Sequence, residues 1–301
     1  MSATDEIAEY SPEWLKLFDG GATVAEGGEC DAESGLTEKQ VGLRRELAAR
    51  LEEGRVLEGP ELQRWGDVRC QLRYLRARGW DVEKALALLR GTVAWRQEYG
   101  PQLSSSRMER ELLRREVASQ KMYIAGQDRS GRPVVVMRPA RDNTGDEDAE
   151  WKVRYLVWVA ERAAELMDSG RGVEKMVWLI EMSGMKVAMT HSMSITKECI
   201  NVMQSHYVER LGKAFFINAP WLFNALWRVI SPFLDPVTKA KVSFIKNDKS
   251  GLRELHRTVD PSQLEPDLAG TFNHNFEIEH WVRTGEFQHS DGPSVEMAGN
   301  S

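Results

Sequence analysis

Short apolar runs and longer helical segments alternate between residues 133 and 245 of the 301-residue chain. The runs are rich in β-branched and aromatic residues, as buried strands are. The predicted strands are PVVVMR (133–138), KMVWLIE (175–181), AFFIN (214–218) and VSFI (242–245). The stretches 151–168 and 193–208, which separate the first three runs, carry apolar residues at helical spacing. Strands that alternate with crossover helices predict an α/β domain built on a parallel or mixed sheet.

The part of the chain before this domain has a helical pattern that begins at Thr37 and continues to Tyr99. Asp67 and Asp81 stand where helix N-caps are expected, so we predict a small all-helical subdomain here. The Gly- and Glu-rich N-terminus predicts a mobile arm instead. The predicted units are a mobile arm (1–36), the helical N-terminal subdomain (37–103), the α/β domain (104–284) and a flexible tail (285–301).

Composition excludes some classes of protein. The 46 acidic and 40 basic side chains give a formal net charge of −6, which argues against a general nucleic-acid binder. Cys30, Cys70 and Cys199 are far apart and lack metal-site spacing, so we expect a reduced intracellular setting and no metal. The N-terminus lacks the pattern of a secretory signal, and no apolar run reaches the roughly 20 residues of a membrane-spanning helix. We therefore expect a cytoplasmic protein whose membrane contacts are peripheral and transient.

The segment WLFNALWRVISPFL (221–234) is apolar almost all round. A helix of this kind is either fully buried or in contact with lipid. Pro220 before it and Pro232 and Pro236 near its end suit a rigid segment with bendable ends. Two interpretations are therefore open, a buried core helix and a movable lid or gate helix. The apolar positions are Trp221, Leu222, Phe223, Leu226, Trp227, Ile230, Phe233 and Leu234.

Three stretches resemble the CRAL-TRIO lipid-binding family. They are YVERLGKAFFINAPWLFNALWRVISPFLDPVTKAKVSFI (207–245), RYLRARGWDVEKALALLRGTVAWRQEYG (73–100) and GRPVVVMRP (131–139). The second is similar to the helical N-terminal part of the family, and the third to its first core strand. The resemblance implies a mixed, mostly parallel sheet and a hydrophobic pocket for one lipid. It also implies that residues 221–234 form the gate helix of that pocket.

The resemblance further implies an inositol headgroup site. Its residues are Arg78, Glu209, Thr238 and Lys241, with Arg210 and Asp235 beside them. The chemistry of the side chains agrees, because Lys241 and Thr238 share one face of a helical turn and supply donors to a lipid phosphodiester. Glu209 can accept hydrogen bonds from the vicinal hydroxyls of inositol, which choline lacks. The alternative interpretation is that Glu209, Arg210 and Lys241 are solvated surface side chains.

The segment after the predicted strand 175–181 departs from the family pattern. Members that handle phosphatidylcholine carry small hydroxyl residues in a G-x-S-x-S/T pattern, whereas this chain reads SGMKVAM. Lys186 and Ala188 occupy the two hydroxyl positions and mark a second-ligand site, so phosphatidylcholine is disfavoured as the second ligand. The ammonium of Lys186 either reaches water along its stem or faces an anionic headgroup in the pocket.

The function we predict is lipid binding and transfer. Phosphatidylinositol is carried between membranes or presented to a lipid kinase, with no cofactor besides the bound lipid. The alternatives are a carrier of a sterol, tocopherol or isoprenoid, a lipid-sensing regulatory scaffold, and a lipid-modifying enzyme. The sequence contains no GxSxG, HExxH, GxxxxGKS/T or strand-to-helix GxGxxG motif. Cys199 and His206 are seven residues apart, but we interpret Cys199 as a packed thiol and predict no enzymatic activity.

Overall fold

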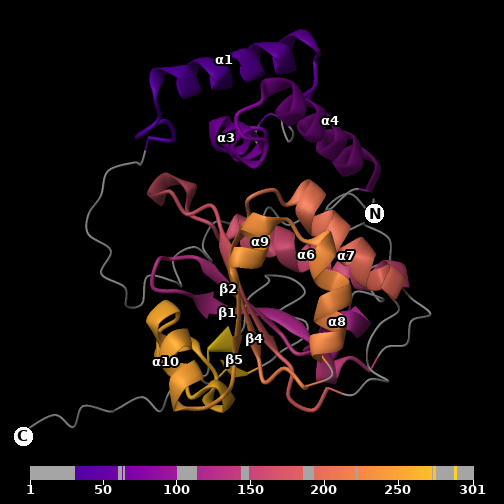
Figure 1. The fold of residues 1–301 in the computed structure, drawn as a ribbon, viewed down its shortest axis with the longest axis vertical. Helices are drawn as coiled ribbons and strands as arrows, with labels where there is room; N and C mark the ends of the chain where they lie inside the picture. Colours follow the sequence, from indigo (N-terminus) through magenta and orange to yellow (C-terminus); the bar gives the residue numbers. More distant parts are fainter. Residues whose placement is uncertain are drawn as a thin grey trace, which may run out of the picture.

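The computed structural model shows a sheet domain with a group of helices beside one end of it (Figure 1). The described residues are 31–59, 63, 65–99, 114–143, 149–185, 193–221, 223–272, 274–275 and 288–289. Most of the predicted arm at 1–36 and most of the predicted tail at 285–301 lie outside them. Within the tail, β7 (Gln288–His289) pairs antiparallel with β6 (His274–Asn275).

The α/β domain is built on one five-stranded sheet whose order, β1-β2-β3-β4-β5, follows the chain. β1 runs antiparallel to β2, and the other neighbouring strands are parallel. The strands are β1 Met122–Gln127, β2 Pro133–Met137, β3 Met176–Glu181, β4 Leu211–Ile217 and β5 Val242–Ile245. The predicted mixed, mostly parallel sheet is therefore confirmed.

The four predicted strands are present, and β4 begins earlier than expected, at Leu211. β1 was not predicted. Its sequence MYIAGQ contains Gly126, and its pairing with β2 shifts register between Ile124 and Gly126. Glycine inside a strand weakens the local strand preference, so the apolar pattern alone does not reveal this strand. Because β1 comes first, residues 131–139 hold the second strand, and their assignment as the first core strand was wrong.

Helices cover the sheet and contribute to its core. They are α6 Ala149–Glu165, α7 Met193–His206, α8 Phe223–Ile230, α9 Pro236–Ala240 and α10 Lys249–Thr258. α6 contacts β1, β2 and α7. Val153, Val157 and Ala160, which belong to the apolar residues at helical spacing in the predicted stretch 151–168, are buried against side chains of α7. Tyr155 and Trp158 join the core of the sheet instead, so α6 is buried on two faces.

Three further helices form what we call the helical unit. They are α1 Glu38–Glu53, α3 Val68–Ala77 and α4 Val82–Tyr99. Thr37 closes a capping box at the start of α1. The predicted caps are confirmed, since Asp67 accepts a hydrogen bond from the backbone N–H of Cys70 and Asp81 accepts one from that of Lys84. These helices share a hydrophobic cluster that also includes Val208, from the turn after α7.

The helical unit also docks on the sheet domain through polar contacts. Arg96 of α4 donates two hydrogen bonds of 3.0 Å to the two carboxylate oxygens of Glu161 on α6. Arg76 of α3 donates a hydrogen bond of 2.9 Å to Glu174, which precedes β3. A bidentate arginine–carboxylate pair fixes direction as well as distance, so these contacts set the orientation of the helical unit.

The same interface holds His206, whose ring stacks on Trp95 with centroids 4.2 Å apart. Burial, and secondarily the charge of Arg96, lower the pKa of His206 from 6.5 to about 4. Between those two pH values the unfolded chain binds a proton that the folded chain does not. The free energy of unfolding should therefore fall as the pH drops through this window.

We predict that His206→Gln makes stability less dependent on pH. Glutamine cannot take up the proton that destabilises the folded wild-type protein. Urea unfolding at about pH 7.5 and about pH 5 measures the difference for the wild type and the variant. The explanation fails if both proteins lose the same unfolding free energy between the two conditions.

A second buried ionic cluster ties the last described part of the α/β domain to the sheet. Arg138, directly after β2, is 4% exposed. Its guanidinium donates to Tyr123 Oη at 3.0 Å and to Asp267 Oδ2 at 2.7 Å, and it also contacts Glu265. Glu181 at the end of β3 lies 3.7 Å away. One side chain therefore joins β1, β2, β3 and the segment after α10.

Candidate lipid headgroup site and apolar lid

The turn between α8 and β5 holds two of the predicted headgroup residues. Asp235 caps α9 and accepts hydrogen bonds from the backbone N–H of Thr238 at 2.9 Å and from Thr238 Oγ1 at 2.6 Å. Desolvation acts to raise the pKa of Asp235, but the hydrogen bonds from Thr238 outweigh it, and the pKa lies below its ordinary value. Because its proton is directed at Asp235, the Thr238 hydroxyl can accept from a ligand, and it can donate only after leaving Asp235.

Glu209 and Lys241, which are distant in sequence, come together in the structure. Glu209 Oε2 lies 3.7 Å from Lys241 Nζ and 3.7 Å from Lys175 Nζ. Lys175 directly precedes β3 and was not predicted by the motif. The side chains of Glu209 and Lys241 are 19% and 17% exposed, so both are sheltered but still reachable. At 3.7 Å these pairs are longer than hydrogen bonds, and a headgroup can complete the bonding of each group.

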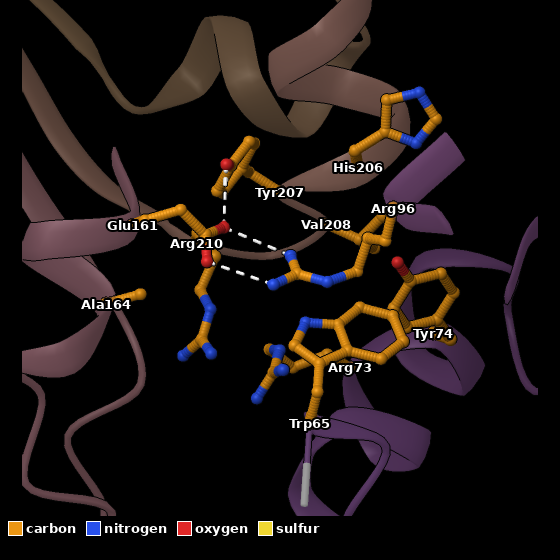
Figure 2. A pocket seen from close by; sticks show the side chains of 10 residues that line it. All are labelled: Trp65, Arg73, Tyr74, Arg96, Glu161, Ala164, His206, Tyr207, Val208 and Arg210. Atoms are coloured by element: carbon orange, nitrogen blue, oxygen red, sulfur yellow. Dashed lines mark hydrogen bonds and ion pairs between the residues drawn. The ribbon is translucent and has the colours of Figure 1, made fainter. Parts of the chain in front are cut away.

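The backbone at Glu209 explains how this side chain reaches the site. Its φ of +58° lies in the left-handed region, which non-glycine residues seldom adopt and which costs about 1–3 kcal/mol. Val208 before it packs against the hydrophobic cluster of the helical unit, and Val208 and Arg210 both line one cavity (Figure 2). The left-handed turn directs the Glu209 carboxylate instead toward Lys241 and Lys175.

Arg78 and Arg210 contact other groups than the Glu209–Lys241 pair. Arg78 is the exposed C-cap of α3, and its Nη1 donates to the backbone oxygen of Ala77 at 3.0 Å. Arg210 Nη1 donates to the backbone oxygen of Glu174 at 3.0 Å. The structure therefore joins Glu209 to Lys241 and Asp235 to Thr238, and the headgroup roles of all six residues stay predictions.

The predicted second-ligand site, Lys186 and Ala188, lies outside the described residues. The structure is described as far as Met185, beyond the end of β3. Glu181 there accepts hydrogen bonds from the backbone N–H of Ser183 at 3.0 Å and from Asn218 Nδ2 at 3.3 Å. The expectation about the second ligand therefore stays a prediction from the sequence.

The apolar segment at 221–234 forms a shorter helix than predicted. α8 covers Phe223–Ile230, and the 3-10 turn η6, Ser231–Phe233, follows it. Pro232 lacks a backbone N–H donor, so α-helical hydrogen bonding cannot continue through it. Trp221 precedes the helix, and Leu222 is outside the described residues. The expectation of one helix over the whole segment was therefore wrong in extent.

The inner face of α8 packs on an aromatic cluster at the edge of the sheet. Phe223 lies with its ring centroid 5.2 Å from that of Phe216 on β4. Trp227, one turn later, lies 5.1 Å from Phe244 on β5 in an edge-to-face arrangement. Aromatic pairs of this kind contribute about 0.5–1.5 kcal/mol beyond area burial. Part of the segment is therefore packed core, as the first interpretation predicted.

The outer face of the same segment remains apolar and open to solvent. Trp221 is 82% exposed, Val229 50% and Phe233 46%, while Ile230 and Leu234 are half-buried. Several exposed large apolar side chains within one short segment are typical of a surface that contacts protein or lipid. The second interpretation, an apolar lid, thus also has a structural basis. None of the described helices is long and apolar enough to span a membrane.

The Cys199–His206 pair lacks the chemistry of an activated nucleophile. Burial raises the pKa of the Cys199 thiol to about 11, and burial lowers that of His206 to about 4. At neutral pH the thiol therefore keeps its proton and the imidazole is uncharged, whereas a reactive cysteine is a thiolate beside a cation. No group of three or more metal-ligating side chains is present in the described part of the chain.

The chain belongs to the CRAL/TRIO family. The CRAL/TRIO domain matches residues 118–270, which contain the whole five-stranded sheet. The CRAL/TRIO N-terminal domain matches residues 42–91, which lie within the helical unit and its connections. The family predicted from three sequence stretches is thereby confirmed.

Several fungal proteins are similar to the chain. A CRAL-TRIO domain-containing protein of Schizosaccharomyces pombe is 35% identical over 221 residues, which are 73% of this chain and 20% of that protein. Phosphatidylinositol transfer protein PDR17 of Saccharomyces cerevisiae is 33% identical over 228 residues, which cover 72% of this chain and 61% of that protein. The SEC14 cytosolic factor of Eremothecium gossypii is 30% identical over 210 residues, which are 66% of this chain and 68% of that protein. The chain thus spans less than two thirds of the length of the first two relatives.

Among solved structures, the crystal structure of Sfh5 has a similar fold. Its TM-score is 0.57 at 16% sequence identity, and the match covers 70% of this chain and 81% of that chain. A likeness at this level of identity supports the fold alone. Function must therefore be argued from the site.

Proposed function

We propose that the protein binds one phospholipid with an inositol headgroup in its α/β domain and carries it between membranes or presents it to a lipid kinase. The observation that carries the proposal is the meeting of Glu209 with Lys241 and Lys175 at a sheltered position. The relative PDR17, named as a phosphatidylinositol transfer protein, adds support from 33% identity.

The charges at this position suit both halves of the headgroup. Lys241 and Lys175 supply ammonium groups for the single negative charge of the phosphodiester. Glu209 supplies a carboxylate that can accept hydrogen bonds from the hydroxyls of the inositol ring. A headgroup without those hydroxyls leaves the carboxylate unpaired, which costs about 1–3 kcal/mol per group. The site therefore favours phosphatidylinositol over phosphatidylcholine.

The apolar lid supports transient membrane contact. We propose that α8 and η6 meet the membrane interface with Trp221 and Phe233, where aromatic side chains are favourable. Lys197 Nζ lies 4.9 Å from the centre of the Phe233 ring, which sets a cation beside the apolar surface. Opening of the lid would then expose to the bilayer the hydrophobic lipid pocket that the family resemblance implies. A cytoplasmic carrier with peripheral membrane binding follows from this cycle, and it requires no metal, nucleotide or covalent step.

We predict that Trp221→Ala weakens binding to liposomes about ten-fold, because burial of a large apolar side chain contributes about 1.5–3 kcal/mol. Trp221 is 82% exposed, so its removal should not unfold the protein. Trp221→Phe is the matched control and should keep most of the binding. Liposome flotation measures both variants. Wild-type binding by Trp221→Ala would exclude this residue from the membrane contact.

The test of the function is native mass spectrometry of the purified protein with lipid extraction. It is followed by exchange against liposomes that contain phosphatidylinositol, phosphatidylcholine or sterol. We expect one phosphatidylinositol per chain and little phosphatidylcholine. Loading of sterol or an isoprenoid alone would keep the fold but refute the headgroup site. Loading of nothing would favour the regulatory scaffold, and turnover of the loaded lipid would show an enzyme.

A further inference from the structure

A cavity of about 40 Å³ lies where the helical unit meets the sheet domain, and neither Glu209 nor Lys241 lines it. α3 contributes Arg73, α4 contributes Arg96, and the segment after α7 contributes Arg210. Trp65 and Glu161 also line the cavity. Figure 2 shows the three arginines directed toward one space from both sides of the interface.

Positive charge exceeds negative charge around the cavity. Glu161 is already engaged, because it accepts two hydrogen bonds from Arg96 and a third from Tyr207 Oη at 2.7 Å (Figure 2). Glu174 is shared among three arginines of α3. The distances from Glu174 are 3.4 Å to Arg69, 3.9 Å to Arg73 and 2.9 Å to Arg76. Among the residues that line the cavity, the charged ones are therefore three arginines, Arg73, Arg96 and Arg210, and the carboxylate Glu161.

Arg73 is the group whose bonding is least complete. It is 4% exposed, yet within the described chain its one ionic partner is Glu174 at 3.9 Å, and its guanidinium makes no hydrogen bond. Opposite it, burial and then the charge of Arg73 lower the pKa of Arg210 to about 10. A buried guanidinium normally has several hydrogen bonds to offset its desolvation. Arg210 donates from one guanidinium nitrogen, Nη1, to the backbone oxygen of Glu174 at 3.0 Å and to Met167 Sδ at 3.2 Å. The incomplete bonding of the Arg73 fork, with a second cation opposite it, indicates an absent anionic partner.

We propose that this cavity binds a phosphate-type oxyanion between Arg73 and Arg210. Planar guanidinium forks match the oxygen spacing of phosphate, and two forks that converge from different elements can hold two of its edges. A volume of about 40 Å³ accommodates roughly three waters at 10–15 Å³ each, which is the size of one tetrahedral oxyanion. The cavity is too small for an inositol ring. The oxyanion therefore enters as a free ion or as the terminal phosphate of a larger ligand.

An anion bound in this cavity would strengthen the contact between the helical unit and the sheet domain. Arg73 belongs to α3, and Arg210 follows the turn that carries Glu209, so the oxyanion would bridge the two parts of the fold. Bound phosphate should therefore stabilise the folded protein by mass action. This inference goes beyond the proposed function, because it does not require that phosphatidylinositol bind at Lys241.

Isothermal titration calorimetry of the full chain with inorganic phosphate, at constant ionic strength set with chloride, tests the proposal. Arg73→Gln and Arg210→Gln should each weaken phosphate binding about ten-fold or more. Arg76→Gln is the matched control, because Arg76 shares Glu174 but does not line the cavity. It should bind phosphate within about two-fold of the wild type. No binding by the wild type, or equal weakening in all three variants, would overturn the proposal.

Arg73→Lys covers the case in which Arg73→Gln does not fold. Lysine keeps the charge and the packing of the stem but lacks the planar fork, so phosphate affinity should still fall. The thermal midpoint gives an independent reading, since phosphate should raise it in the wild type and less in Arg73→Lys. Equal shifts in both proteins would contradict a fork-specific site.

Liposomes that contain a phosphatidylinositol monophosphate distinguish the two sources of the oxyanion. If Arg73→Gln loses binding to free phosphate but not to these liposomes, the ligand is a soluble phosphate. If it loses both relative to Arg76→Gln, the phosphomonoester of a lipid headgroup reaches the cavity. If liposome binding and phosphate binding are both unchanged, no anion site exists between Arg73 and Arg210.

Discussion

Replacement of Lys241 by alanine is expected to lower phosphatidylinositol loading about ten-fold or more and to leave stability nearly unchanged. A charge-assisted hydrogen bond to a ligand contributes about 1.5–3 kcal/mol, and Lys241 is the cation that contacts Glu209 from the end of α9. Within the described part of the chain the Lys241 side chain makes one long ion pair, at 3.7 Å, so folding loses little when it is removed. The occupied fraction after liposome exchange, measured by native mass spectrometry, gives the effect on loading.

Lys239→Ala is the matched control for this experiment, since it removes the same charge from the same short helix at an exposed position. It should load phosphatidylinositol as the wild type does. Urea unfolding of both variants separates ligand effects from folding effects. If Lys241→Ala loses stability and loading in proportion, the residue is a structural element rather than a headgroup contact.

Replacement of Arg138 by methionine should lower the free energy of unfolding by about 3–5 kcal/mol. Arg138 is 4% exposed, and its removal would leave Glu265, Glu181 and the Tyr123 hydroxyl without their cation in a buried place. Methionine fills most of the volume, so the loss reports on charge and hydrogen bonding rather than on a cavity. Chemical denaturation of the unliganded protein measures it.

Arg141→Met provides the comparison, because Arg141 is exposed in the turn just after Arg138 and, among the described residues, its side chain makes 3.4 Å contacts with Gln120 alone. Its effect should stay within about 0.5 kcal/mol. An equally small effect of Arg138→Met would show that water replaces the guanidinium, and that the last described segment of the domain is held by apolar packing alone.

The elements that the sequence predicted are those with a strong local signal. β2, β3 and β5 carry nearly continuous apolar runs. Asp67 predicts the start of α3, because aspartate is a preferred N-cap residue. β1 lacks such a signal because of Gly126, and its pairing with β2 depends on contacts made only after the chain folds back. The end of α8 was placed too late because apolar character continues through η6 after the helical hydrogen bonding has stopped.

The candidate site shows the same division. Glu209 and Lys241 were found because a family motif places them, and the structure adds that they contact each other. Lys175 was missed because a lysine ahead of a strand is common and only the parallel pairing of β3 with β4 sets it beside Glu209. The arginine cavity had no sequence signal, since Arg73 and Arg210 lie on separate elements and each alone resembles a surface cation.

The position of Val208 limits how this protein can be re-engineered. Its side chain completes the hydrophobic cluster of the helical unit, and its neighbour Glu209 holds a left-handed conformation at the proposed headgroup site. If Glu209 binds the headgroup as proposed, the ligand specificity of the α/β domain depends on a surface that another segment of the chain supplies. Consider a chimera that takes its N-terminal helices from one relative and its sheet from another. The apolar surface of those helices must fit the side chain of Val208. Otherwise the chimera alters headgroup preference without any change in the residues that touch the lipid.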